Sequence, residues 1–588
     1  MKSSLMSSGV AGLLAVFGAA FSLVGSQVGA YAVGPPTYVL IDAGAFGGEP
    51  TIASDSNGVL YDTTPSGGTR LYRSYDSGDT WAQVTTADPK SGDDCVTTDQ
   101  SNAVYECNLA GTNTLPLQAD VWKSLNQGGT WTKGANQVSG NGNTCGGSCD
   151  AFGVDRQWTT AWIPPGGTTA NAHVVLMYHD FYGPSQIWVN VSTDGGATFA
   201  ASKPVLLNPA ATPGSVLGSG LGNLFSECNT VPSGIYTVKT GPHAGRIYVS
   251  WIAADAAQNT SGCNVSMAQS FHDLWVAWSD DVGNTWTTQQ AFDGMVGHDA
   301  STPFATFTQD DKGNPYIAFA DNLNANPATC SAESTTGGSA LQNDTTCESN
   351  MYVVWSSDGG STWDGGGGLV PGSAATPYQV NTATETGTHW FPTIAVGDPG
   401  HVDVGYLRTP TIQPTDSTGK ADPGACAGPS TATPNYPPAC AWNLFAGQSQ
   451  NLTLPPGTAT WTSSQLTAVP MHIGDICNLG IACVSSLGSN RSLLDFNSET
   501  VDPRGCAHIA YADNNNGSKT PPASPHNAHL VVATQVSGPS AFVNAPNCVA
   551  LPVATPEVPW PGLLVPAAAA VAFIGWRSRR RFRTAAAS

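Results

Sequence analysis

The sequence predicts an all-β protein built as a β-propeller, and three observations support this prediction. Gly (66) and Pro (42) are abundant, and short apolar runs alternate with Gly, Pro, Thr, Ser and Asn, which is typical of many short strands joined by turns. No long stretch of apolar residues at helical period occurs outside the two ends of the chain. A strand–turn–strand unit recurs seven times, and internal repeats of this length indicate a propeller or an array. A pair of β-sandwiches would not explain the sevenfold pattern.

The N-terminal residues predict an export signal. Lys2 precedes an apolar run from about Val10 to Val24, and small residues follow up to an A-x-A cleavage site at residues 30–32. We therefore assign residues 1–32 to a signal peptide and expect the rest of the chain to be exported.

The C-terminus predicts a membrane anchor. After a Pro-rich linker at 549–559, residues 560–576 carry no charge and have Trp at both ends, at the lower limit of length for a membrane span. Five arginines lie within 577–588, as expected for a cytoplasmic tail. This end resembles the surface-anchoring tails of bacterial exported proteins, in which a Pro-Glu motif precedes an apolar span and an Arg cluster. We expect residues 33–548 to form an extracellular domain at the cell surface, with processing and release as the alternative.

The predicted extracellular domain is strongly acidic. Without Lys2 and the five arginines of the tail, the chain keeps 15 basic residues against 42 acidic ones, of which all but Glu557 lie within 33–548, a net charge of −27. Such a surface repels phosphate backbones, so we expect no nucleic-acid partner.

The 14 cysteines are expected to form disulfides, because exported proteins keep their cysteines oxidised. Neighbours in the sequence suggest the pairs Cys95–Cys107, Cys145–Cys149, Cys228–Cys263, Cys330–Cys347, Cys426–Cys440, Cys477–Cys483 and Cys506–Cys548. The first pair lies symmetrically about the turn at 99–102, as a cross-strand pair would. A metal site is disfavoured, because no CxxC pair or His cluster accompanies these cysteines.

One turn sequence, S-x-D-x-G-x-T-W, recurs along the chain. The copies are SYDSGDTW (74–81), SLNQGGTW (124–131), VSTDGGATF (191–199), SDDVGNTW (279–286), SSDGGSTW (356–363) and a decayed copy that ends in TATW (458–461). The Asp carboxylate can accept hydrogen bonds from backbone amides ahead of it, and Asn126 can do the same in the second copy. Gly supplies a positive φ, and Trp or Phe buries a large apolar area. We therefore predict that the turn is structural and that its Asp residues do not meet a substrate.

These turns resemble Asp-box (BNR) repeats, which occur in sialidases and related β-propellers and join the outer two strands of a blade. The resemblance covers roughly residues 38–548. Seven blades is the direct count, and six, the sialidase number, is the alternative. We expect residues 37–42 to supply the strand that closes the ring.

The turns also predict which face carries the function. With the strands of a blade labelled A to D from the centre outward, the short A–B turns lie on the same face as the Asp boxes between strands C and D. The long B–C and D–A loops lie on the opposite face. Because elaborated loops on a rigid scaffold usually carry binding, we expect the functional site there.

The loop-rich face gathers the residue types that a sialidase-like reaction needs. The resemblance implies three arginines that clamp a substrate carboxylate, a Tyr nucleophile, a Glu that activates it and an Asp acid/base. The candidates at strand ends on this face are Arg156, Arg408, Arg491, Tyr406, Glu49, Glu227 and Asp299. The alternative is that the arginines form ordinary ion pairs and the tyrosine packs in the core.

One departure from the sialidase pattern weighs against catalysis. Sialidases begin their first blade with an aromatic-Arg-Ile-Pro motif, whereas this chain reads AFGGEPTIA, with Gly48 where the arginine would be. Two hypotheses follow. The protein is either a sialidase-like glycoside hydrolase acting on extracellular glycans or polymers, or a non-catalytic binding or scaffolding propeller.

Four B strands end in similar sequences that place an Asp near the mouth of the central channel, namely Asp180, Asp255, Asp321 and Asp513. Several carboxylates held close together can recruit a hard cation such as Ca²⁺. The alternative is that each Asp caps its own loop in a solvated rim. We expect no other cofactor.

Overall fold

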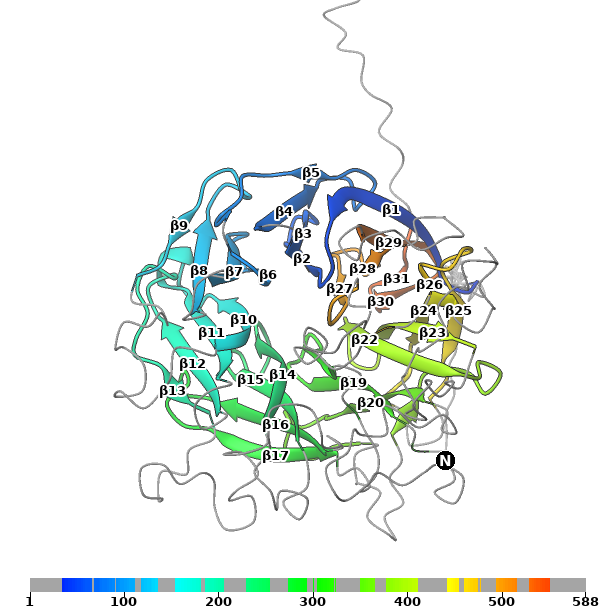
Figure 1. The fold of residues 1–588 in the computed structure, drawn as a ribbon. Coiled ribbons are helices and arrows are strands. Elements are labelled where there is room, and N and C mark those ends of the chain that lie inside the picture. The colour runs from blue at the N-terminus through cyan, green and yellow to red at the C-terminus, as the bar shows by residue number, and fades with distance from the viewer. Residues whose placement is uncertain are drawn as a thin grey trace, which may run out of the picture.

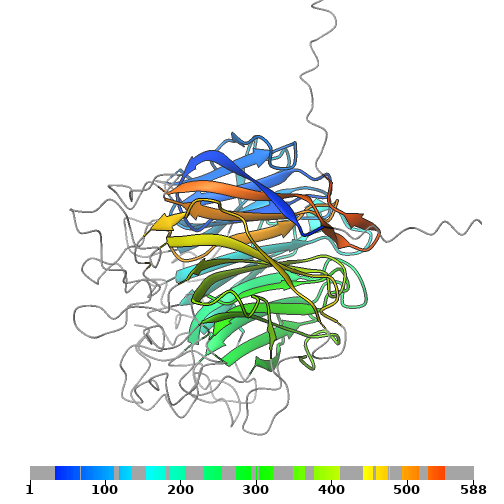
Figure 2. The ribbon, with the colours of Figure 1, turned by 90° about the vertical axis from the view of Figure 1, so that its right-hand side faces the viewer.

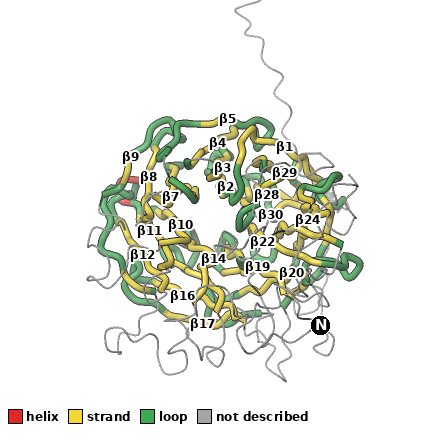
Figure 3. The backbone as a smooth tube through the Cα atoms, viewed as in Figure 1, coloured by secondary structure: helices red, strands yellow, loops and turns green. Residues whose placement is uncertain are grey.

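The structure, a computed structural model, is a seven-bladed β-propeller (Figure 1). The fold class and the direct blade count are confirmed. The structure describes residues 34–549 with gaps at 66–67, 90, 111–117, 136–153, 181–185, 206–228, 254–272, 293–299, 301–303, 322, 324–348, 365–376, 411–440, 454–458, 474–475, 477–492 and 515–527. Within these residues nearly all regular structure is strand, and one short 3-10 helix, η2 (Thr169–Asn171), interrupts it (Figure 3).

Each blade is an antiparallel sheet whose four main strands run outward from the channel in the order A to D. The strands of blades 1 to 3 are β2 (Thr51–Ser54), β3 (Leu60–Pro65), β4 (Thr69–Ser74), β5 (Ala82–Gln83), β6 (Asp94–Thr98), β7 (Val104–Ala110), β8 (Gln118–Ser124), β9 (Thr132–Lys133), β10 (Val154–Trp162), β11 (His173–Asp180), β12 (Gln186–Ser192) and β13 (Lys203–Pro204). Those of blades 4 to 6 are β14 (Asn229–Thr237), β15 (Ile247–Ala253), β16 (Asp273–Ser279), β17 (Thr287–Phe292), β18 (Thr306–Gln309), β19 (Pro315–Asp321), β20 (Asn350–Trp355), β21 (Tyr378–Gln379), β22 (Thr388–Val396), β23 (Val402–Thr409), β24 (Ala441–Ser449), β25 (Thr462–Gln465) and β26 (His472–Ile473), which also pairs with β24.

Blade 7 joins the two ends of the domain. Its strands are β27 (Ser498–Val501), β28 (Ala507–Asp513), β29 (His529–Ser537) and, as the outermost strand, β1 (Thr37–Phe46). Figure 1 shows β1, from the start of the chain, beside β29, from its end. The prediction that residues 37–42 close the ring is therefore confirmed.

The B strands are buried on both faces, because each blade packs between two neighbours. All seven residues of β19, PYIAFAD, are buried. Such a strand reads as a nearly continuous apolar run, and this is the signal that made the repeats visible in the sequence.

The A strands leave one edge open to the central channel, and side chains of neighbouring blades satisfy part of that edge. Ser498 Oγ accepts a hydrogen bond from Ile52 N at 3.2 Å, and Thr160 Oγ1 accepts one from Thr237 N at 3.0 Å. These bonds explain why the inner strands are rich in Ser and Thr, since buried backbone groups must find partners.

The repeated turn makes the hydrogen bonds that its sequence predicts. Asp76 Oδ1 accepts from Thr80 N at 2.8 Å, and Asp76 Oδ2 accepts from the Thr80 hydroxyl at 2.6 Å. Ser74 Oγ accepts from Gly78 N at 2.8 Å, and Gly78 has a φ of 91°. In the decayed copy Thr460 N still donates to Asn451 Oδ1 at 2.9 Å. The turn is thus a local backbone device.

A second turn motif, which the sequence analysis missed, lies between strands A and B. An Asp accepts hydrogen bonds from two backbone amides and from a Tyr hydroxyl six residues later. The pairs are Asp55–Tyr61, Asp99–Tyr105 and Asp310–Tyr316. In blade 7 His508 stands in the Tyr position, with its Nε2 3.3 Å from Asp502 Oδ2. The fixed D-x₅-Y spacing could have identified this motif in the sequence.

Both kinds of turn lie on one face, as predicted. The Tyr248 hydroxyl donates at 3.0 Å both to Gly313 O, in an A–B turn, and to Gly359 O, in a copy of the repeated turn. We call this the back face and the opposite one the front face.

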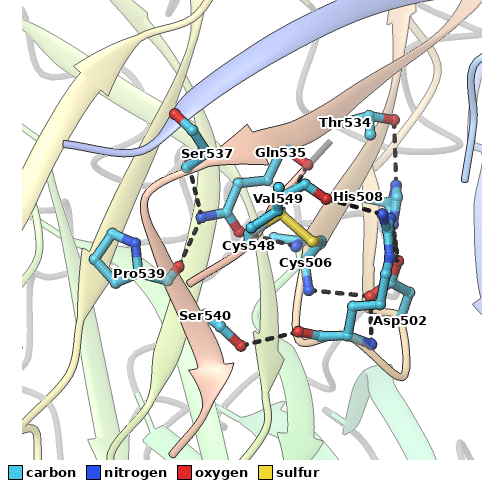
Figure 4. Close-up of a disulfide and its surroundings, with 12 residues drawn as sticks. Asp502, Cys506, His508, Thr534, Gln535, Ser537, Pro539, Ser540, Cys548 and Val549 are labelled. Atoms are coloured by element: carbon cyan, nitrogen blue, oxygen red, sulfur yellow. Dashed lines mark hydrogen bonds and ion pairs between the residues drawn. A yellow bond between two sulfur atoms is a disulfide. The ribbon is translucent and has the colours of Figure 1, made fainter. Parts of the chain in front are cut away.

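A C-terminal hairpin, β30 (Pro539–Phe542) and β31 (Ala545–Asn547), lies on the back face, where it projects from the disc (Figure 2). Ala541 N donates to Gly505 O at 2.8 Å, and a disulfide between Cys506 and Cys548 ties the hairpin to the A–B turn of blade 7 (Figure 4).

Two of the predicted disulfides, Cys95–Cys107 and Cys506–Cys548, are confirmed. The other five pairs lie outside the described residues, as do the predicted signal peptide, anchor and tail. No helix in the described part of the chain is long and apolar enough to cross a membrane.

Candidate functional site

The best-defined candidate site lies at the front end of the central channel, around Arg156. Arg156 Nη1 is 3.2 Å from Glu49 Oε2 and 3.0 Å from Asp93 Oδ2. Glu49 precedes the inner strand of blade 1, Asp93 precedes that of blade 2, and Arg156 lies near the start of that of blade 3. Arg156 and Glu49 are only 4% and 2% exposed, so this ion pair is shielded from solvent.

Aromatic rings support the Arg156 guanidinium. Its central carbon lies 4.1 Å from the Phe496 ring and 5.1 Å from the Trp158 ring, within the range of cation–π attraction. Phe496 precedes β27 of blade 7. The centroid of its ring lies 5.2 Å from the ring centroid of Trp158 of blade 3 and 6.0 Å from that of Phe304, beside blade 5. Rings from three separate blades therefore meet at this end of the channel.

The backbone enters blade 1 in an unusual conformation. Glu49 has a φ of +48° and precedes Pro50, a combination that sterics disfavour. Phe391 has a φ of +55° before Pro392, at the start of the same Pro-Thr-Ile-Ala sequence in blade 6. The strain is therefore a feature of how these inner strands begin and is not by itself a sign of chemistry.

The surroundings of Gly48 leave no room for the arginine that sialidases have at the corresponding position. A Cβ atom at this position would lie 2.6 Å from Leu493 O, which belongs to the segment entering blade 7. The two entering segments are thus too close for any side chain at residue 48.

A cavity of about 280 Å³ occupies the channel behind the aromatic rings. Its lining comes from the inner strands of all seven blades and is rich in Thr and Ser, and its two charged residues are Lys239 and Glu499. Lys239 Nζ donates to Thr98 O at 2.8 Å, which leaves donor capacity for a ligand. The Lys239 side chain contacts solvent but lies among surrounding protein atoms. These atoms partly desolvate the ammonium group, which lowers its pKa.

The predicted nucleophile, Tyr406, lies in another part of the ring. Its hydroxyl is 2.7 Å from both Glu385 Oε2 and Ser463 Oγ. Ser463 belongs to β25, the outermost strand of blade 6, so the Tyr406 side chain points away from the channel. Burial, followed by the charge of Glu385, raises the Tyr406 pKa. A Tyr–Glu pair therefore exists, but it is enclosed in the packing between blades 5 and 6.

The two predicted arginines that the structure describes, Arg156 and Arg408, lie on different blades. Arg408 donates from Nε and Nη2 to Thr386 O at 3.0 and 2.7 Å, on blade 6, whereas Arg156 is on blade 3. Arg491, Glu227 and Asp299 lie outside the described residues, so their predicted roles remain predictions.

The predicted cation site also remains a prediction. Asp321 is buried at the end of β19, Asp513 is half-buried at the end of β28, Asp180 ends β11, and Asp255 is not described. Among the described side chains, no group of three or more His, Cys, Asp or Glu residues is arranged to hold a metal ion.

Several residues of the site were not found by sequence reasoning, namely Asp93, Trp158, Lys239, Phe304 and Phe496. Only Trp158 had a local signal, because it follows Arg156 by two residues and so lies on the same side of a strand. The others come from distant segments.

No protein-family model and no curated protein matches the chain. Among solved structures, it is similar to a protein of unknown function from Dyadobacter fermentans, with 12% identity, coverage of 86% of this chain and 98% of that one, and a TM-score of 0.36. It is also similar to an ulvan lyase, with 12% identity, coverage of 84% and 95%, and a TM-score of 0.40. A leech intramolecular trans-sialidase has 12% identity, coverage of 84% and 68%, and a TM-score of 0.34. At these values the comparisons assign no residue of the site.

Proposed function

We propose that the protein is an exported, surface-anchored propeller of the Asp-box, sialidase-like type that binds extracellular glycans without hydrolysing them. The observation that carries this proposal is the state of Arg156. Two carboxylates, Glu49 and Asp93, already neutralise its charge, and aromatic rings cover it. An arginine held in this way is not presented as a clamp for a substrate carboxylate.

The channel offers the chemistry that sugars need. Glycans present apolar C–H faces, which pack on aromatic rings, and hydroxyl groups, which exchange hydrogen bonds with Ser, Thr and backbone groups. Trp158 and Phe304 are half-buried, and the cavity behind them is lined with hydroxyls. We therefore place the glycan at the front end of the channel, with part of one sugar entering the cavity.

The test is glycan binding by the purified full-length protein, measured by a glycan array and then by calorimetry. Phe304→Ala should weaken binding at least tenfold, because it removes a partly exposed ring at the site. The matched control is Tyr75→Ala, which removes a ring that is 60% exposed on the repeated turn at the back face and should leave affinity unchanged. Equal losses in both variants, or no glycan bound by the parent protein, would refute the proposal.

A sialidase-like hydrolase is the second candidate, and the Tyr406–Glu385 hydrogen bond is the observation in its favour. Release of the fluorophore from a fluorogenic sialoside by the parent protein, with loss of that activity in Tyr406→Phe, would favour this candidate.

A further inference from the structure

Two carboxyl groups are buried together at the seam between blades 6 and 7. Asp403 accepts hydrogen bonds from Gln448 Nε2 at 3.0 and 3.1 Å and from the Tyr38 hydroxyl at 3.3 Å. Glu499 Oε2 accepts one from Gly405 N at 3.1 Å, and Glu499 Oε1 is buried without a hydrogen-bond partner among the described residues. Tyr38 belongs to β1, so this seam includes the strand that closes the ring.

The surroundings of this seam supply little positive charge. On the sides of the described strands that face this seam, the other titratable side chains are Asp42, Tyr511, Asp513, His472 and His529. Arg408 and His508 lie on the opposite sides of β23 and β28, because side chains alternate along a strand. His529 Nδ1 is 2.8 Å from Asp42 Oδ2, and His472 Nδ1 is 2.8 Å from Asn514 Oδ1. The two imidazoles are thus engaged elsewhere, at the front end of the seam.

A second buried carboxyl group lies at the seam between blades 1 and 2. Glu106 on β7 is fully buried, and neither carboxyl oxygen has a hydrogen-bond partner in the described part of the chain. The neighbouring Val96 and Val104 on the same face pack against Tyr61 and Leu71 of blade 1. On this face Lys133 pairs with another carboxyl group, since its Nζ is 2.5 Å from Asp120 Oδ2.

The remaining titratable groups around Glu106 are already used or are themselves acidic. They are Tyr61, bonded to Asp55; Arg73, bonded to Gln127 O; Arg156, paired with Glu49 and Asp93; and the carboxyl groups of Asp88, Asp94 and Asp120. Glu106 therefore faces acidic neighbours and has no cation of its own among them.

We propose that the folded propeller is most stable in mild acid and is suited to a mildly acidic environment. At that pH the carboxyl groups at these two seams are neutral, which lets blade 6 pack against blade 7 and blade 1 against blade 2. The proposal does not depend on glycan binding.

The pKa directions agree with this reading. Burial raises the pKa of Asp403 to about 7, against the lowering effect of its hydrogen bonds from Gln448 and Tyr38. Burial and then the charge of Asp403 raise the pKa of Glu499, and burial and then the charge of Asp94 raise that of Glu106. In the repeated turn the balance is reversed. Although burial raises the pKa of Asp76, hydrogen bonds from Thr80 lower it below its ordinary value.

The seam carboxyls and the carboxylates of the repeated turn make stability depend on pH in opposite directions. An unfolded chain ionises its carboxyl groups at about pH 4. Above that pH the seam carboxyls ionise more readily in the unfolded state, so stability falls as the pH rises from about 4 toward the folded-state pKa, which is about 7 for Asp403. Below about pH 4 the turn carboxylates become protonated, and their stabilising contribution is lost as the pH falls. Stability should therefore be greatest at roughly pH 4 to 5, below the usual range of about pH 5 to 8.

The experiment is thermal unfolding of the full-length protein from pH 3 to 8, in low salt and in 1 M salt. High salt screens repulsion across the acidic surface, since the Debye length falls to about 3 Å, but it does not reach buried groups. We expect the melting temperature to peak near pH 4 to 5 and to fall by pH 8 at both salt concentrations. A peak at pH 7 or above, or loss of the pH dependence in 1 M salt, would overturn the proposal.

Replacing a seam carboxyl group by an amide of the same shape tests whether the pH dependence comes from the seams or from charges on the surface. Asp403→Asn and Glu106→Gln should each raise the melting temperature by about 3 °C at pH 7.5 and leave it unchanged at pH 4. The control Asp79→Asn, at an exposed position, should shift neither value. Because the two variants lie at different seams, one remains informative if the other fails to fold. A lower melting temperature at pH 7.5 in the folded variants would contradict the inference.

Discussion

Replacing Arg156 with Met tests whether the channel mouth depends on its buried ion pair. The substitution keeps an unbranched side chain but removes the cation, which leaves Glu49 buried without its Arg156 partner. Breaking a buried pair from one side typically costs about 3–5 kcal/mol, and loss of a desolvated cation–π contact adds about 2 kcal/mol. Asp93 contributes little to this cost, because its side chain is 28% exposed and water can replace the arginine. We expect Arg156→Met to lower the free energy of unfolding by roughly 5–7 kcal/mol.

A double-mutant cycle distinguishes this explanation from a simple loss of packing. Glu49→Gln alone should also be destabilising, since it leaves the buried cation with one partner fewer. The double variant Arg156→Met, Glu49→Gln should recover about 2 kcal/mol relative to the sum of the two single losses. Urea unfolding of the full-length protein measures all four free energies. A loss below about 1 kcal/mol in Arg156→Met, or strict additivity in the cycle, would refute the reasoning.

Three further outcomes are expected. Asp76→Ala should lower the free energy of unfolding by about 1–2 kcal/mol, the cost of losing a capping acceptor, without changing glycan affinity; normal unfolding with lost binding would contradict the structural role of the turn. Replacing Cys506 and Cys548 by Ser opens a cross-link with a sequence separation of 42 residues and should cost about 4 kcal/mol in the chain-entropy model, while unfolding under reducing conditions should be the same for both proteins. Deleting residues 560–588 should release a folded domain into the medium, and retention of the truncated protein in the membrane fraction would place the anchor elsewhere.

The fold could be predicted because each blade repeats its own local chemistry. The Ser, Asp, Gly and Thr of the repeated turn bond mainly to one another, so their spacing is visible without any knowledge of the rest of the chain. Blade 7 lacks this turn, yet its strand–turn–strand unit at 493–513 was recognisable from its apolar runs. The closing strand at 37–42 followed from the need of the last blade for a fourth strand.

The site could be predicted only in part, because it depends on contacts between distant segments. Phe496 stacks on Arg156 from a position 340 residues away, and no local pattern links the two. Tyr406 lies near the front end of a B strand, as expected, but the alternation of side chains along that strand and the position of Phe445 direct its hydroxyl outward. The seam carboxyls were missed for the same reason, since a strand sequence does not tell which neighbouring blade an alternate residue will face.

The packing of the segment that enters blade 1 determines which side chains the channel mouth can contain. Gly48 is required because the segment at Leu493 crosses within 2.6 Å of where its Cβ would be, and that same segment brings Phe496 into the channel. The space between the two segments can therefore hold either a side chain at residue 48 or the segment that carries the ring over Arg156, but not both. This chain has the ring, and the carboxylate of Glu49 pairs with Arg156 at the mouth. The lack of a side chain at residue 48 is thus coupled to the aromatic ring over Arg156, and an arginine already held by carboxylates and rings agrees with the proposed binding of a sugar face rather than the capture of an anionic substrate.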